Sequence, residues 1–498
     1  MHRFAMRCMD NPDVDTPHLD GLAEQGALFR HAYSSTPVCS PFRVNLVSGR
    51  YGMETGAKGN QCLLPEWCRS LVDDFNDSGY RTSFVGKWHV GATGNQPIPE
   101  EWRAGFQEFI GYQCYNGFYK DVCFYDEAGT ERRFEKHRTD ATVDVAIERL
   151  RRVASDPFLM IVGFQAPHYP EQPGPEFDRM YRGRDVTPRP NYTGIDLYIP
   201  THSPKSPRPF ERCPDFRRYG NDIHEYLRMY YGMVTQIDAN VGRLLSELED
   251  LGIADDTIVL FASDHGDLAG SHGMNGKCVS YEESAGIPLL MRGPGVPQGM
   301  VIDAPIDSSS FLPTCMELAG VPASQADTAS RSRAALLRGE PDDRPAFADL
   351  RNWCMVRQGD FKLTIEDDDS LAVAALLSDE KVDLATAQAL ADAIPGAEVI
   401  RPAAGHIGMV VGRRGMDGMW RPLSQWLEKL WLNGLSSKIK NMKSRLLKMN
   451  YCIKLKWKKW LIFITMKWIK QLKSQWNKKE LISLKKITMP CLHLIQLN

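Results

Sequence analysis

The fold class of this 498-residue chain is decided by residues 257–267, TIVLFASDHGD. An apolar run with β-branched residues leads here directly into a cluster of titratable side chains. Runs this apolar predict strands that are buried on both faces of a mainly parallel sheet. Three further runs have the same form, at residues 27–29, 81–86 and 158–164, and each leads toward a polar cluster.

Helical patterns lie between these runs. Thr16-Pro17 begins one segment that Gly26 ends, and residues 139–154 form another. The longest, about residues 223–251, has apolar side chains at a spacing of three or four. Alternating strands and helices predict an α/β fold in which helices sandwich the sheet. Ligands of such folds bind beyond the carboxyl ends of the strands, where all four polar clusters fall, so we expect one shared site.

Three regions follow from the distribution of these patterns. Residues 1–340 form the expected catalytic domain, which includes a Pro- and Arg-rich excursion at residues 171–220 that could shape a substrate site. Residues 341–434 form a smaller α+β subdomain, in which residues 345–365 predict antiparallel strands. Residues 435–498 form a tail of different composition.

The charge is distributed unevenly. The net charge is −2, but residues 435–498 carry sixteen Lys or Arg and one acid, so the first 434 residues have a net charge of −17. That acidity argues against a nucleic-acid partner. The tail could be a basic amphipathic helix for a membrane surface, or a frameshifted or chimeric segment. The abrupt change of composition favours the second interpretation, and we expect no membrane contact.

The cysteines indicate neither a metal cage nor a dense disulfide framework. Twelve cysteines are scattered along the chain without a Cys-x-x-Cys pair. Such thiols are expected mostly in the core of a protein in a reducing compartment. No signal peptide is visible at the start of the sequence, where polar residues follow within a few positions.

A possible nucleophile lies in residues 38–50, VCSPFRVNLVSGR. Ser40 is expected to be the N-cap of a helix with Pro41 as its first residue, which places Cys39 just before a helix N-terminus that favours an anion. Arg43 lies one turn into the helix and could reach back to the same site. The same sequence pattern would also fit a buried free thiol beside a helix start that has no catalytic role. A phosphatase loop does not fit, because its Cys and Arg are farther apart.

The other polar clusters suggest an anion site and a cation site. Lys87 and His89 lie two residues apart on an extended segment and could address one anion. Asp264 and His265 suit a divalent cation. Each cluster taken alone also fits a structural role, as a surface loop, a loop cap, an acidic turn or a helix start. The remaining candidates are His168 and Lys277.

Together, these motifs resemble those of the type I, formylglycine-dependent sulfatases of the alkaline phosphatase superfamily. The matching segments are residues 38–50, 86–91, 165–168, 263–273 and 277–290. The resemblance implies a sulfuric ester hydrolase whose nucleophile is a formylglycine made from Cys39 by a modifying enzyme. A hydrated aldehyde can attack sulfur with one hydroxyl and expel sulfate with the other, whereas a thiolate would be left as a stable thiosulfate ester.

The resemblance also implies a role for each candidate residue. Cys39 would be both nucleophile and metal ligand, and Asp264 and His265 would hold a Ca²⁺ ion, with Mn²⁺ or Mg²⁺ as alternatives. Asp264 would also take a proton from the aldehyde hydrate, and Arg43 would steady the formylglycine.

Four cationic or imidazole side chains would act on the substrate. Lys87, His168 and Lys277 would bind the sulfate oxygens, and His168 and Lys277 would also protonate the leaving oxygen. His89 would assist the release of sulfate. The physical reason is that charge grows on the leaving oxygen and stays on the sulfuryl oxygens, so cations that stabilise both should carry most of the rate.

The sequence departs from the family pattern at its start. The family's first strand ends in an Asp pair that supplies two metal ligands, but no acid precedes Asp10 here. We therefore expect weakened metal binding and two neighbouring strands with unpaired edges.

Three alternatives stay open. The chain could be an inactive relative that only binds anions, a phosphonate or phosphodiester hydrolase, or a thiol enzyme that uses unmodified Cys39. The substrate could be a small-molecule or a glycan sulfate ester, and the oligomeric state is not predicted.

Overall fold

The computed structural model describes residues 1–192, 194, 197–199, 208–209, 218–324, 331–366, 371–375, 397–400 and 408–411. The predicted tail at residues 435–498 lies outside these residues, as does part of the excursion predicted at residues 171–220. The chain divides into two compact units, residues 1–414 and 415–498, and the described residues all belong to the first. The domain boundaries at residues 340 and 434 stay predictions.

The first sheet brings two of the predicted polar clusters to one edge. Its strand order is β6 (Glu131–Arg133), β5 (Cys123–Tyr125), β4 (Glu108–Tyr112), β3 (Arg81–Lys87) and β7 (Phe158–Gly163). β3 is parallel to both β4 and β7, whereas β5 and β6 are antiparallel additions. Because parallel strands end at the same edge of a sheet, the segments that follow β3 and β7 emerge side by side.

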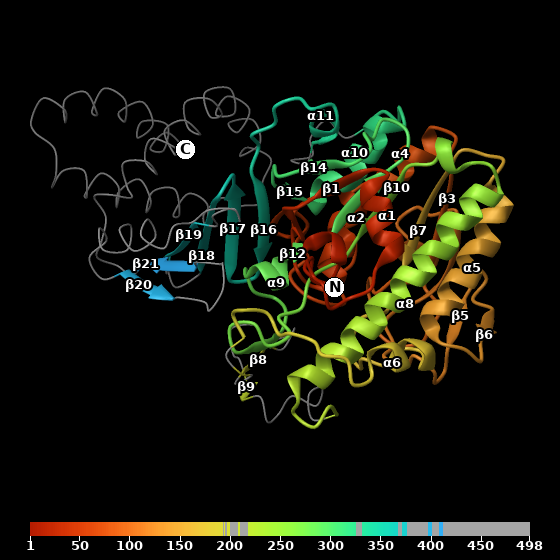
Figure 1. Cartoon of the computed structure of the whole chain (residues 1–498). Coiled ribbons are helices and arrows are strands. Elements are labelled where there is room, and N and C mark those ends of the chain that lie inside the picture. The colour runs from red at the N-terminus through yellow and green to blue at the C-terminus, as the bar shows by residue number, and fades with distance from the viewer. Residues whose placement is uncertain are drawn as a thin grey trace, which may run out of the picture. The chain divides into compact units, whose positions relative to one another are not determined.

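Helices cover both faces of this sheet. Successive side chains of a strand point to opposite faces, and in β3 Val85 packs against α5 (Arg138–Val153) while Phe84 packs against residues of α2 (Cys39–Ser48). The long helix α8 (Ile223–Asp250) lies beside α5 (Figure 1). The predicted α/β sandwich is therefore confirmed.

The remaining helices are shorter. The helix predicted after Thr16 begins at Pro17. They are α1 (Pro17–Glu24), α3 (Gly52–Thr55), α4 (Leu71–Asp77), α6 (Pro175–Tyr181), α9 (Glu282–Ala285), α10 (Phe311–Leu318) and α11 (Ala334–Leu337).

The second sheet is mixed rather than parallel. Its order is β10 (Val259–Ala262), β13 (Leu289–Arg292), β1 (Ala27–Phe29) and β14 (Met300–Ile302). β13 runs antiparallel to both of its neighbours, and only β1 and β14 are parallel. Parallel pairing in the two larger sheets is thus confined to β4, β3 and β7 of the first sheet and to β1 with β14 of the second.

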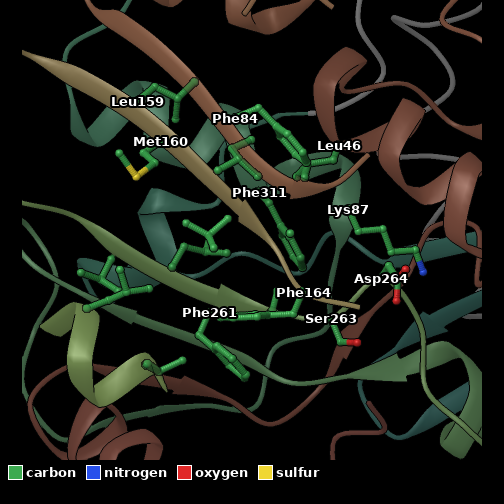
Figure 2. Close-up of a pocket in the computed structure, with 18 of the residues that line it drawn as sticks. Leu46, Phe84, Lys87, Leu159, Met160, Phe164, Phe261, Ser263, Asp264 and Phe311 are labelled. Carbon is green, nitrogen blue, oxygen red and sulfur yellow. The ribbon is translucent and has the colours of Figure 1, made fainter. Parts of the chain in front are cut away.

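Between the two sheets, β7 and β10 face each other across a cavity. Each pairs along one edge only with the strands that the structure describes, as expected from the sequence. The cavity measures about 950 Å³ and has mainly apolar walls. Figure 2 shows Met160 and Phe261 along it, with Lys87 and Asp264 at its polar end.

A smaller antiparallel sheet packs beside the larger body. Its order is β16 (Ala346–Leu350), β17 (Trp353–Gln358), β18 (Phe361–Glu366) and β19 (Leu371–Ala375), which confirms the antiparallel strands predicted at residues 345–365. The other strands are β2 (Ala32–Tyr33), β8 (Leu197–Ile199), β9 (Arg208–Pro209), β11 (Met274–Gly276), β12 (Gly286–Ile287), β15 (Ile306–Asp307), β20 (Ala397–Ile400) and β21 (Gly408–Val411). No helix in the described ranges is both long and apolar enough to cross a bilayer.

A half-buried acid in this smaller sheet predicts a pH dependence of stability. Burial raises the pKa of Asp349 from 3.8 to about 7, although backbone N–H groups of Met53 and Gly52 donate to it. The folded protein therefore binds the proton more tightly than the unfolded chain, so the free energy of unfolding falls as pH rises from about 4 to about 7.

Replacing Asp349 by Asn should remove this dependence. We expect the Tm of Asp349→Asn to exceed that of the wild type near pH 8 and to change less between about pH 5 and pH 8. Thermal unfolding across that range measures it, with the exposed Asp255→Asn as a matched control. Parallel Tm curves for Asp349→Asn and wild type would contradict the assignment.

Candidate active site

Cys39 is the first residue of α2 rather than the residue before it. The N-cap is Val38, whose backbone is extended, so the prediction that Ser40 caps the helix is wrong. The reason lies in a distant loop, because the Ser40 hydroxyl accepts the N–H of Gln61 at 3.0 Å and the Ser40 N–H donates to Asn60 Oδ1 at 3.3 Å. Cys39 thus lies in the first turn, where helix N–H groups favour an anion, and it is 1% exposed.

Two lysines and a histidine surround the Cys39 sulfur. Lys277 Nζ lies 3.6 Å and Lys87 Nζ 3.9 Å from Sγ, and His265 Nε2 lies 3.2 Å from it. Burial alone would raise the pKa of the Cys39 thiol, but Lys277, Lys87 and His265 together hold that pKa well below its ordinary value. The site therefore stabilises negative charge at residue 39.

Arg43 ties the strand ends to each other. Its Nη1 donates to the carbonyl oxygen of Lys87 at 2.5 Å, and its Nη2 lies 3.6 Å from Asp264 Oδ2. One guanidinium thus links the end of β3 with the segment that follows β10. Residues far apart in the sequence are held in one site by this contact.

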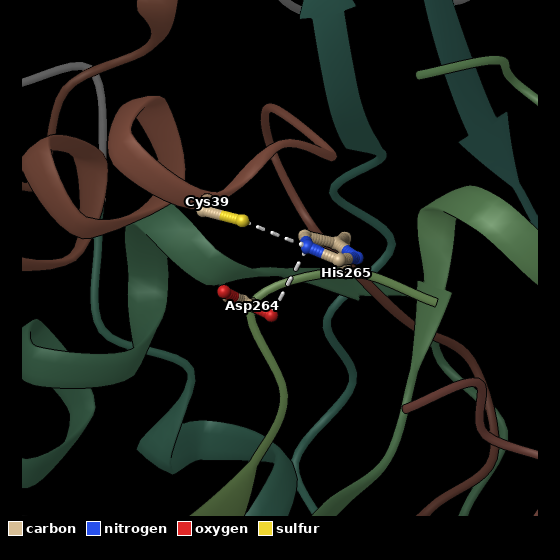
Figure 3. A group of neighbouring side chains, drawn as sticks. All are labelled: Cys39, Asp264 and His265. Atoms are coloured by element: carbon tan, nitrogen blue, oxygen red, sulfur yellow. Dashed lines mark hydrogen bonds and ion pairs between the residues drawn. The ribbon is translucent and has the colours of Figure 1, made fainter. Parts of the chain in front are cut away.

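Three donor atoms converge on one point. One ligand atom each from Cys39, Asp264 and His265 lies within 4.8 Å of the others, and in the part of the chain that the structure describes no other such group is found (Figure 3). His265 Nδ1 lies 2.8 Å from the carbonyl oxygen of Gly266, so a proton on Nδ1 leaves the Nε2 lone pair toward Cys39 and Asp264. This arrangement can hold a metal ion.

The charge state of Asp264 supports the same conclusion. Burial opposes its ionisation, but His265, Arg43 and Lys87 hold the pKa of the Asp264 carboxyl far below its ordinary value. The carboxylate is therefore ionised at neutral pH and available as a ligand. Lys277 keeps its proton, because the negative charges of Cys39 and Asp264 outweigh burial and raise the pKa of Lys277.

The two remaining histidines border the same site. His168 Nδ1 lies 2.7 Å from the carbonyl oxygen of Tyr169, and burial together with Lys277 and Lys87 lowers the pKa of His168 well below its ordinary value. His89 has a left-handed backbone, φ 54°. Burial would lower its pKa, but the sulfurs of Cys114 and Cys39 outweigh burial and raise the pKa of His89.

Most of the predicted site residues therefore meet. Six of them are joined by direct contacts: Cys39, Arg43, Lys87, Asp264, His265 and Lys277. His168 lines the cavity that Lys87 and Lys277 also line. His89 interacts electrostatically with Cys39.

Sequence reasoning missed Cys114 and Asn60. Cys114 lies two residues beyond β4, and Lys87 and His89 overcome burial to lower the pKa of its thiol to about 7. Its position at the carboxyl end of a strand parallel to β3 was a usable signal. The sequence gives no signal for Asn60, because only the folded loop brings its side chain to the N–H of Ser40.

The smaller sheet fixes two segments of the site. Trp353 Nε1 donates to the carbonyl oxygen of Cys278 at 2.9 Å, next to Lys277. Arg351 Nε donates to the carbonyl oxygen of Lys58 at 2.5 Å, in the loop that carries Asn60. Both contacts come from one hairpin, so this sheet positions a cation and a loop at the nucleophile.

Comparisons with known proteins agree on one family. The family model described as Sulfatase matches residues 1–321. An ulvan-active sulfatase of Formosa agariphila is 32% identical over 320 residues, and the match covers 62% of this chain and 58% of that protein. This chain thus spans less than two thirds of that relative's length.

Solved structures share the fold. One, in complex with its substrate D-glucosamine-2-N,6-O-disulfate, has a TM-score of 0.64 at 24% sequence identity. The match covers 75% of this chain and 88% of the chain in that structure. A phosphonate monoester hydrolase of Agrobacterium radiobacter has a TM-score of 0.59 at 20% identity, covering 77% and 87%. At these identities the likeness shows the fold alone.

Proposed function

Because the chain belongs to the sulfatase family, we propose that its buried site hydrolyses a sulfate monoester. The observation that carries the proposal is the ring of cations at the start of α2. Lys87 and Lys277 lie within 3.9 Å of the Cys39 sulfur, and Arg43 lies beside them. Preorganised positive charge of this kind stabilises the sulfuryl oxygens and the leaving oxygen in the transition state.

We propose that Cys39 is converted to formylglycine by a modifying enzyme. The hydrated aldehyde supplies one hydroxyl to attack sulfur and a second to release sulfate, which regenerates the aldehyde. Two observations support this assignment: Cys39 begins a Cys-x-Pro-x-Arg sequence, and its side chain lies in the first turn of α2. Because residue 39 is 1% exposed, the modifying enzyme must act before the fold closes.

Asp264, His265 and residue 39 are the proposed ligands of a divalent cation. Ca²⁺ is proposed, with Mn²⁺ and Mg²⁺ as alternatives, because an ionised carboxylate and an oxygen at residue 39 suit a hard ion. The cation would polarise the sulfuryl oxygens and favour deprotonation of the attacking hydroxyl. Asp264 lies beside residue 39 and can take that proton.

The surrounding residues bind the sulfate group and protonate the leaving oxygen. Lys87 and Lys277 bind sulfuryl oxygens as fixed positive charges. His168 has its Nδ1 occupied by the Tyr169 carbonyl, which leaves Nε2 to face the leaving oxygen. An anionic substrate offsets the two lysines that disfavour the imidazolium, so its binding raises the pKa of His168 and lets it donate a proton.

His89 completes the proposed cycle. Its imidazole is buried and interacts electrostatically with residue 39, which supports the proposal that His89 receives a proton when sulfate leaves. The substrate is proposed to be a small-molecule or glycan sulfate ester, since a structural neighbour is described with a disulfated sugar as its substrate.

Comparing two esters tests the proposal. We expect a higher kcat/KM for 4-nitrophenyl sulfate than for 4-nitrophenyl phenylphosphonate, using protein produced together with the modifying enzyme. Both esters carry one negative charge, so the cations alone do not separate them, and the expectation rests on family membership. A preference for the phosphonate would contradict it.

A further inference from the structure

A second polar feature lies beside the cations. Gln165 follows β7 and is 3% exposed, and its Oε1 has no hydrogen-bond partner in the described part of the chain. Its Nε2 donates to Asn116 Oδ1 at 3.2 Å and lies 3.9 Å from the Cys114 sulfur. One end of this amide is thus held in place, while the acceptor end is buried without a donor, a condition that costs free energy.

This amide lies within the site already described. The N–H of His168 donates to the Gln165 carbonyl at 3.1 Å, so both residues belong to one tight turn. Gln165, Asn116, Lys87 and His168 line the same cavity. Asn116 is exposed, whereas Gln165 is buried, so the pair joins the protein surface to the interior.

We propose that Gln165 and Asn116 form a subsite that binds a hydroxyl group of the alcohol portion of the substrate. The inference rests on the proposed sulfate ester hydrolysis and names its substrate class as a polyhydroxylated sulfate ester, such as a sulfated sugar. A hydroxyl both donates and accepts, so it can donate to Gln165 Oε1 and accept from an amide N–H.

Other ligand groups fit the pair less well. A second sulfate would bring acceptor oxygens against the Gln165 acceptor, and an aromatic ring offers Oε1 no donor. Sites built to hydrogen-bond a hydroxyl reject analogues that lack it, because the buried polar group is then left unpaired. Gln165 is therefore expected to determine specificity.

The test compares two substrate types in one variant. We would measure kcat/KM of Gln165→Leu for 4-nitrophenyl sulfate and for a panel of hexose monosulfates with the sulfate at each position. The ratio for the best hexose sulfate over 4-nitrophenyl sulfate is expected to fall roughly 10- to 100-fold. Where Gln165→Leu does not fold, Gln165→Met removes the same amide and is measured identically.

A matched control separates recognition from packing. Gln113 is fully buried, and its amide also lacks a described partner, but it does not line the cavity. Gln113→Leu is expected to leave the substrate ratio unchanged. The same ratio change in both variants, or an equal loss on both substrates in Gln165→Leu, would overturn the inference.

The wild-type enzyme provides the remaining outcomes. Hydrolysis of 4-nitrophenyl sulfate with no preference for any hexose sulfate would overturn the subsite and leave the proposed function standing. Failure to hydrolyse any sulfate ester would overturn the proposed function itself, and the subsite with it.

Discussion

Replacing Cys39 by Ala should abolish sulfate ester hydrolysis, with a loss of roughly 10⁴-fold or more in kcat. The variant removes a side chain that Lys87, Lys277 and His265 all contact. It leaves those groups in place, so the binding charge remains while the attacking group is gone. Turnover of 4-nitrophenyl sulfate measures the effect.

Folding of this variant should be largely retained. The lost side chain is small, so the Tm should change by a few degrees at most for a chain of this size. Cys123→Ala is the matched control, because Cys123 is a buried free thiol in β5, away from the proposed metal ligands. Wild-type turnover by Cys39→Ala would show that the central assignment is wrong.

The second large effect is expected for Asp264→Asn. The substitution keeps the side chain's shape and removes a charge that His265 and Arg43 hold in its ionised form. We expect metal affinity to fall more than roughly 100-fold and turnover to fall with it. The same loss should follow chelation of the wild-type metal, with recovery on adding Ca²⁺ and comparison with Mn²⁺ and Mg²⁺.

Metal content resolves the two roles proposed for Asp264. Bound metal per protein, measured after dialysis, should be lost in Asp264→Asn and kept in Asp250→Asn, an exposed acid at the end of α8. A variant that retains wild-type metal but loses turnover would leave Asp264 as a proton acceptor and remove it from the ligand set. Unchanged metal and turnover would contradict both roles.

The strands and long helices could be predicted because their signals are local. The apolar runs at residues 81–86 and 158–164 became β3 and β7, and the apolar periodicity from residue 223 became α8. Since β3 and β7 are parallel, their carboxyl ends coincide, which is why Lys87 and His168 share a cavity.

The predictions that proved wrong concern features that depend on contacts between distant segments. The cap of α2 shifted from Ser40 to Val38 because the loop at residues 60–61 engages the serine. The direction of β13 is set by its pairing with β10 and β1, which no pattern within β13 encodes.

Residues that act through other residues were equally invisible. Trp353 lies 75 positions from Cys278, and only the packing of the small sheet brings its indole N–H to the carbonyl beside Lys277. Gln165 was read as part of a motif that points to His168, and its separate role depends on the Asn116 contact. Neither contact can be predicted from the spacing of residues along the chain.

The most direct test of the account relates the chemistry of residue 39 to the rate. Co-production with graded amounts of the modifying enzyme gives protein in which mass spectrometry measures the fraction of Cys39 converted to the aldehyde. The rate of 4-nitrophenyl sulfate hydrolysis per protein should rise in proportion to that fraction and pass through zero at none. Full activity in unconverted protein, abolished by iodoacetamide, would instead make the thiol itself the nucleophile and contradict the account.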